Sequence, residues 1–202
     1  MRGSLLTEGT TNRPGKIAGW RSRLAGLWSA SMLASVAVGV LAGLVAAQVR
    51  LHLGLPGHKA LFWMAPVLVA RLLGRHPLGA TVGASAAACT ALGLGENLAG
   101  GLLYLPLVAL AGTVLDVAAG LAERRHLSAR WLVPLLGASG LAANVLCAAK
   151  RLLTPLKNTH FVFGVEGAWA TVLSYALFGL LAGVGGAALA VLARGARQRR
   201  EL

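Results

Sequence analysis

The chain has 202 residues, of which 56% are hydrophobic and only 12% are charged, and its mean hydropathy is +0.71. A soluble domain of this size could not bury that much apolar surface, so the composition excludes the soluble classes and indicates a membrane protein. The net charge of +13 does not indicate nucleic acid as a partner, because the basic residues occur in tails and in short loops between apolar runs. Membrane insertion produces that distribution.

The apolar runs predict an all-α, polytopic membrane protein, a bundle of six transmembrane helices between a basic N-terminal tail (1–26) and a basic C-terminal tail (194–202). A helix of about 20 residues crosses the hydrocarbon core. The second run is short and is interrupted by Pro66, which points either to a substrate site, as in transporters, or to a tilted helix without a binding role. The predicted spans are 27–48, 60–73, 77–95, 99–121, 131–153 and 168–193.

The basic residues predict that both tails are cytoplasmic. Five Lys and Arg residues lie in the N-terminal tail, two near Arg75, three before Trp131 and four in the C-terminal tail. An inner excess of this kind sets the orientation of a multi-pass protein. The chain is therefore expected in a bacterial-type inner membrane, crossing it several times.

The first span carries small residues at a spacing of four, which places them on one side of a helix. Such stripes let helix backbones approach closely. One interpretation is packing within the bundle, and the other is docking onto a partner membrane protein. The two stripes are Ala30, Ala34, Val38, Ala42 and Ala46, and beside them Ser35, Gly39, Gly43 and Ala47.

A polar loop, 50–59, follows the first span and belongs to the outer side in this topology. Cations on that side run against the charge rule. They either pair with lipid phosphates and with Glu96 and Glu166, or they bind an anionic ligand. The basic residues of this side are Arg50, Lys59, Lys150, Arg151 and Lys157, and His58 accompanies them.

Polar residues also occur inside the spans, where a polar side chain must face the bundle. Asn144 shares a helix face with Cys147 and Arg151, and Tyr175 begins the sixth span together with Thr171 and Ser174. These groups predict either an outward-facing pocket or a set of interhelical hydrogen bonds. Asp116 is expected to have a structural role, paired with Arg71 or with Arg124 and Arg125.

Catalytic signatures are absent from the sequence. It contains no Gly-x-Ser-x-Gly, no His-Glu-x-x-His and no phosphate-cradling loop of the Walker type. The histidines form no i, i+4 pair for a metal. The two cysteines lie in apolar segments, where we expect small buried side chains. The sequence therefore predicts no enzyme activity, no cofactor and no metal.

The size, the six spans, the basic ends and the polar first loop resemble the substrate-binding S component of an energy-coupling factor (ECF) transporter, a class that captures vitamins and related micronutrients. The clearest motif is Ala30-Ser-Met-Leu-Ala34, which is similar to the Ala-x-x-x-Ala of that family's first span. The likeness covers residues 27–193.

The resemblance implies a function and a set of site residues. Ala30 and Ala34 would dock the transmembrane coupling subunit, a pair of ATPases would supply the energy, and the loop 50–59 would close over a small polar or anionic substrate. The implied ligand candidates are Asn97, Asn144, Lys150, Arg151 and Tyr175, beside the Arg50, His58 and Lys59 of the loop.

Two other functions remain open from the sequence. One is a small membrane enzyme that acts on lipid headgroups at the outer face, with His58, His160 and Glu166 as acid and base groups. The other is a non-catalytic assembly or scaffold protein, which would have no enclosed pocket and only paired polar groups within the membrane.

Overall fold

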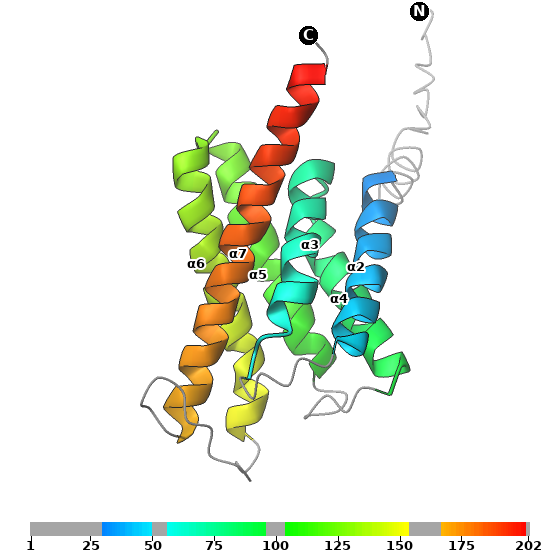
Figure 1. Cartoon of the computed structure of the whole chain (residues 1–202), viewed down its shortest axis with the longest axis vertical. Coiled ribbons are helices and arrows are strands. Elements are labelled where there is room, and N and C mark those ends of the chain that lie inside the picture. Colours follow the sequence, from blue (N-terminus) through cyan, green and yellow to red (C-terminus); the bar gives the residue numbers. More distant parts are fainter. Residues whose placement is uncertain (1–29, 50–55, 96–103, 154–166, 201–202) are drawn as a thin grey trace, which may run out of the picture.

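The computed structural model describes residues 30–49, 56–95, 104–153 and 167–200, except for the side chains of 150–153 and 200. The described part of the chain is all-α, as predicted. Six helices follow one another along it (Figure 1): α2 (Ala30–Gln48), α3 (Ala60–Gly74), α4 (Gly79–Gly93), α5 (Tyr104–Arg124), α6 (Ala129–Leu153) and α7 (Gly167–Arg200).

Four of these helices, α2, α5, α6 and α7, are long and apolar enough to cross a membrane, which indicates a multi-pass membrane protein. The other two are shorter. α3 and α4 have 15 residues each, or about 22 Å at the rise of an α-helix, against a hydrocarbon core of about 30 Å.

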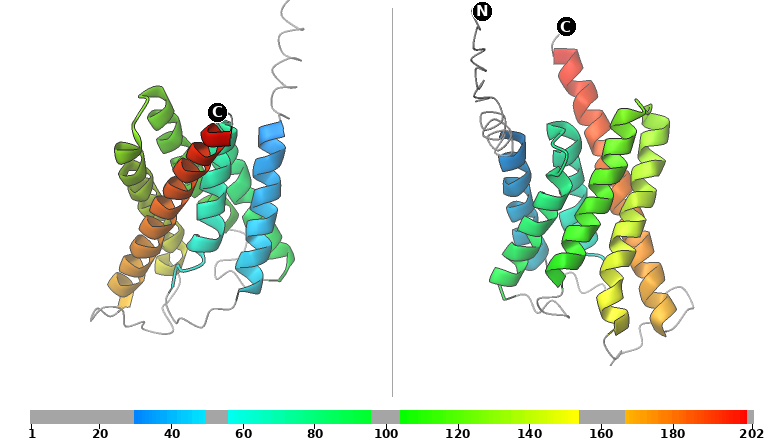
Figure 2. Two further views of the ribbon diagram at one scale, coloured as in Figure 1. Left: turned by 45° about the horizontal axis from the view of Figure 1, so that its top comes forward. Right: turned by 180° about the vertical axis from the view of Figure 1, so that it is seen from behind.

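The helices alternate in direction, so α2 begins where α7 ends (Figures 1 and 2). This end of the bundle, which also holds the turns 75–78 and 125–128, is called the terminal end below. The far end holds the last turn of α2, the turn 56–59 and the first turns of α5 and α7. α3 lies inside the bundle and contacts α2, α4, α5 and α7.

Glycine allows the closest helix contacts. A Cβ atom at Gly39 of α2 would overlap the carbonyl oxygen of Gly83 in α4, and a Cβ at Gly183 of α7 would overlap that of Leu136 in α6. Small residues give backbones this proximity where the hydrophobic effect does not hold helices together. In the stripe of Ser35, Gly39, Gly43 and Ala47, the first three residues are buried and serve internal packing, whereas Ala47 is partly exposed.

The other stripe of α2, which begins at Ala30, is buried at one end and exposed at the other. Ala42 and Ala46 are buried against the bundle, whereas Ala30 and Ala34 are exposed. The two alanines of the proposed docking motif thus lie on the outer surface of this chain.

Some predicted helix boundaries were wrong. α3 runs without a break through Pro66, which was expected to interrupt it. Proline has no backbone N–H, so one carbonyl of the preceding turn loses its donor. Neighbouring helices surround this segment and keep it helical. α5 continues to Arg124 instead of residue 121. α7 continues to Arg200 instead of residue 193, since charged residues do not end a helix that extends beyond the apolar core.

Candidate functional site

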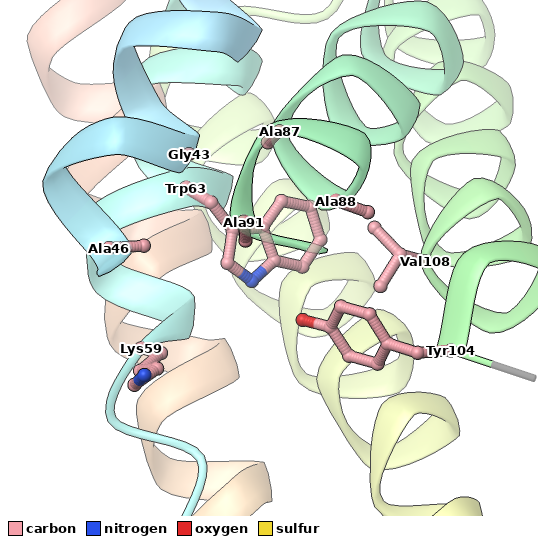
Figure 3. Close-up of a pocket in the computed structure, with 9 residues that line it drawn as sticks. All are labelled: Gly43, Ala46, Lys59, Trp63, Ala87, Ala88, Ala91, Tyr104 and Val108. Carbon is pink, nitrogen blue, oxygen red and sulfur yellow. The ribbon is translucent and has the colours of Figure 1, made fainter. Parts of the chain in front are cut away.

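A cavity lies at the far end, between α2, α3, α4 and α5 (Figure 3). Each helix contributes its residues nearest that end. Lys59, Trp63 and Tyr104 are the large side chains around it, and the remaining walls are small or aliphatic: Gly43, Ala46, Ala87, Ala88, Ala91 and Val108.

Local structure explains how Lys59 and Trp63 reach the same cavity. Gly57 adopts φ = 87°, which a side chain disfavours, and the chain then turns into α3 with Lys59 as its N-cap residue. Lys59 and Trp63 are four residues apart and so share a face of the helix. Trp63 is buried, and in Figure 3 its indole lies beside the ring of Tyr104 from α5.

The cavity combines one cation with aromatic and apolar walls. This is the usual chemistry of a small-molecule site, in which a few polar groups orient a ligand among apolar ones. The space in it that a water molecule can occupy is about 20 Å³. In the described conformation it therefore has room for about one water.

The turn 56–59 is held by side chains from α6 and α7, an arrangement called the turn clamp below. The hydroxyl of Ser174 donates to the carbonyl of Pro56 over 2.6 Å. The amide of Asn144 donates to the carbonyl of Tyr175 over 2.7 Å and to that of Gly57 over 3.4 Å. The ring of His58 meets Phe178 edge to face, with 6.3 Å between centroids.

The turn clamp brings together three of the predicted ligand residues. Asn144 and Tyr175 are buried, and both contact the turn that carries His58 or one another. The sequence allowed either an outward-facing pocket or interhelical hydrogen bonds here, and these residues form the hydrogen bonds. Lys59 belongs to the same turn but lines the cavity on the other side of α3.

The other predicted site residues cannot be placed in either arrangement. Lys150 and Arg151 belong to the last turns of α6, beyond the described side chains. Arg50, Asn97, His160 and Glu166 lie outside the described residues.

A charged cluster occupies the terminal end. The Nε of Arg71 donates to Oδ1 of Asp116 over 2.8 Å, and its Nη1 and Nη2 donate to the two carboxylate oxygens of Glu123 over 2.9 and 3.2 Å. Arg71 is buried, and Glu123 is partly exposed. The predicted pairing of Asp116 with Arg71 is confirmed.

Asp116 also completes the start of α4. Its carboxylate accepts the backbone N–H groups of Ala80 and Thr81 over 3.0 and 2.8 Å, and the hydroxyl of Thr81 over 2.7 Å. With Arg71 this makes four donors, which use the full capacity of a carboxylate. A negative charge at a helix N-terminus is also favoured by the helix dipole, so this cluster joins α3, α4 and α5.

Three residues of these arrangements were missed in the sequence: Trp63, Tyr104 and Glu123. Two of them had a signal in their spacing. Trp63 follows Lys59 by one helical turn, and Glu123 follows Asp116 by seven residues, or two turns of the same face. Tyr104 has no such signal, because only the packing of α5 beside α3 and α4 brings it to the cavity.

No protein-family model, curated protein or solved structure matches the chain. Within the described residues, no group of three or more His, Cys, Asp or Glu side chains is placed to hold a metal ion.

Proposed function

We propose that this protein is the substrate-capture subunit of a nutrient uptake transporter, similar to the S component of an ECF transporter. In this proposal the six helices all belong to the membrane domain of an inner-membrane protein, and both tails are cytoplasmic. The far end then faces outward, where a small polar or anionic nutrient arrives. A coupling subunit and a pair of ATPases move the nutrient inward, since the chain has no Walker motif.

The observation that carries the proposal is the far-end cavity with Lys59 at its edge and Trp63 and Tyr104 in its wall. An ammonium group attracts an anionic substituent, and aromatic rings cover the apolar body of a ligand. A nutrient needs more space than one water, so binding requires the ends of α2 and α5 to move apart. The small residues Gly43 and Ala46 form the α2 wall that would move.

The surface of α2 supports the partner role. Ala30 and Ala34 are exposed and lie next to Leu33, a large apolar side chain that is 52% exposed. A face with small residues beside apolar ones suits close packing against another transmembrane helix. The buried stripe of the same helix is already used within the chain, which leaves this face for a partner.

The first experiment is affinity purification of the tagged protein from its native membrane, with mass spectrometry of co-purifying proteins and of retained small molecules. The proposal expects an ATPase pair, a coupling membrane subunit and one bound metabolite. Recovery of lipid alone, with no ATPase and no metabolite, would contradict it.

The cavity is then tested with the metabolite that is recovered. Lys59→Gln and Tyr104→Phe are expected to weaken its binding by about tenfold or more, as loss of one charge-assisted contact does. Trp169→Phe is the control, because Trp169 lies at the same end but is 72% exposed. Equal affinity in all three variants would place the site elsewhere.

The docking surface is tested separately. Ala30→Leu combined with Ala34→Leu is expected to block recovery of the coupling subunit while metabolite binding persists. Ala142→Leu adds the same bulk on an exposed position of α6 and should leave recovery unchanged. Loss of partner in the control as well would argue against a specific face on α2.

A second candidate function is a non-catalytic assembly protein. The observation in its favour is the complete pairing of Asp116, which leaves this intramembrane carboxylate no capacity for a ligand. This function expects stable co-purifying membrane proteins without a metabolite, so the same purification distinguishes the two.

A further inference from the structure

A second and larger hollow lies at the terminal end, between α3, α5, α6 and α7. Its volume is about 330 Å³. Arg75, Glu123, His126 and Arg194 form its polar side, and aliphatic side chains such as Leu72 and Leu127 form the other. This terminal-end cavity is unrelated to the far-end site and has no part in the proposed transport function.

The balance of charge in this cavity is positive. Arg71 pairs with both Asp116 and Glu123, so these three side chains carry one net negative charge, against which Arg75 and Arg194 bring two positive charges. Arg194 donates one hydrogen bond, to the carbonyl of Leu72. Within the described part of the chain, the side chains of Arg75 and His126 make no hydrogen bond or ion pair. The cavity thus offers donors that no group of the described chain uses.

The backbone supports the same conclusion. Arg75 has φ = 55° and His126 has φ = 49°, and they are the described non-glycine residues with positive φ. Each ends a helix at the position where glycine is usual: the N–H of Arg75 bonds to the carbonyl of Arg71, and that of His126 to Glu123. A side chain in this conformation costs free energy. Both of these costly side chains line one cavity.

An apolar groove adjoins the cavity. Its volume is about 430 Å³, and Leu127 lines both spaces. The groove continues over Leu121, Trp131 and Leu135, on the outside of α5 and α6. Trp131 is 60% exposed, and indole rings favour the membrane–water boundary. A cationic cavity and an apolar groove that meet at one residue match a ligand with an anionic head and an apolar chain.

We propose that this site binds a phosphate-bearing anion, the headgroup of an anionic phospholipid from the leaflet at the terminal end. Arg75, His126 and Arg194 contact the phosphate oxygens, as arginine forks do in charge-assisted pairs. One acyl chain lies in the groove beside Trp131. Basic pockets between transmembrane helices are a known chemistry for such headgroups. Free phosphate shares the headgroup chemistry but leaves the groove empty.

The test uses the purified full chain in detergent and measures binding of three probes: dioctanoyl-phosphatidylglycerol, dioctanoyl-phosphatidylcholine and inorganic phosphate. The phosphatidylglycerol is expected to bind about tenfold more tightly than the phosphatidylcholine, a difference of one charge contact. Arg75→Gln and, separately, His126→Gln should each remove most of this preference. Arg199→Gln is the matched control, since it removes a charge from an exposed position of the same end.

The groove is tested with Leu135→Gln, which should weaken phosphatidylglycerol and leave inorganic phosphate unaffected. Phosphate binding that falls in Arg75→Gln, together with phosphatidylglycerol binding that does not respond to Leu135→Gln, would support the anion site and identify free phosphate as its ligand. Equal affinity for the two lipids together with no phosphate binding would overturn the proposal. Equal losses in Arg199→Gln and Arg75→Gln would also overturn it. If Arg75→Gln does not fold, His126→Gln tests the same anion site with the same expected loss of preference.

Discussion

The two ends of α3 are held in place by different chemistry. At the far end, the turn clamp uses neutral donors from Asn144 and Ser174, which satisfy backbone carbonyls. At the terminal end, Arg71 joins two carboxylates, and one of these completes the start of α4. Both arrangements answer the same requirement, because backbone polar groups within a bilayer need partners in the protein.

The difference lies in what happens when one partner is lost. A neutral hydrogen bond between transmembrane helices contributes roughly 0.6 kcal/mol on average. At the terminal end Asp116 accepts from four donors, so its loss leaves several groups unsatisfied, at about 1–3 kcal/mol for each buried one. The terminal end should therefore be rigid, whereas the far end, beside the cavity, can rearrange at a smaller cost.

The largest effect is expected from Asp116→Ala. This change leaves three donors, the Nε of Arg71 and the N–H groups of Ala80 and Thr81, without their acceptor, while Arg71 keeps its pair with Glu123. Each unsatisfied buried group costs about 1–3 kcal/mol, so the free energy of unfolding should fall by about 3–5 kcal/mol. Thermal unfolding in detergent measures it. The combined Arg71→Met and Asp116→Leu variant should be more stable than Asp116→Ala, because it also removes the Nε of Arg71, one of the donors left without an acceptor, and replaces it by apolar side chains. A double variant as unstable as the single one would contradict this account.

A smaller effect is expected from the glycine contacts between the two ends. Gly183→Ala would force α7 away from Leu136 of α6, and overpacking of this kind costs about 1–3 kcal/mol. Gly185→Ala is the matched control on the same helix, because nothing lies within 4 Å of a Cβ there. It should be neutral or stabilising by up to about 1 kcal/mol. Similar unfolding temperatures for the two variants would show that the close contact carries no stability.

A substitution in the turn clamp should lower the free energy of unfolding by a smaller amount. Asn144→Ala removes the donor to the carbonyls of Tyr175 and Gly57, and the expected loss is roughly 0.6–1.7 kcal/mol. Unfolding of this variant and of Asp116→Ala under one set of detergent conditions compares the two ends directly. A loss as large as that of Asp116→Ala would remove the distinction between them.

The smallest effect is expected from Glu123→Gln. The side chain of Glu123 is 34% exposed, so solvent screens its pair with Arg71 and the loss of stability should stay below about 1 kcal/mol. Arg71 keeps its bond to Asp116 in this variant. A loss above that of Asn144→Ala would mean that Arg71 needs both carboxylates as hydrogen-bond acceptors.

The sequence by itself determined the class of this protein and much of its helical layout. Long apolar runs require helices in lipid, and the predicted second, third and fifth spans agree with α3, α4 and α6 to within two residues at each end. It also predicted a basic partner for Asp116, either Arg71 or Arg124 and Arg125, because a lone acid within an apolar run needs a cation at similar depth, and the structure selected Arg71. The predicted C-terminal ends of α5 and α7 lie too early in the sequence, because the apolar residues stop before the helix does.

Only the tertiary structure decided which way each helix faces. α2 is apolar on all sides, so periodicity could not show that Gly39 and Gly43 turn inward while Ala30 and Ala34 stay exposed. Periodicity also could not show that Lys59 lines the cavity whereas Asn144, predicted for the same pocket, joins the turn clamp. In lipid, both the neighbouring helices and the solvent are apolar, so backbone proximity and hydrogen-bond partners select the buried face.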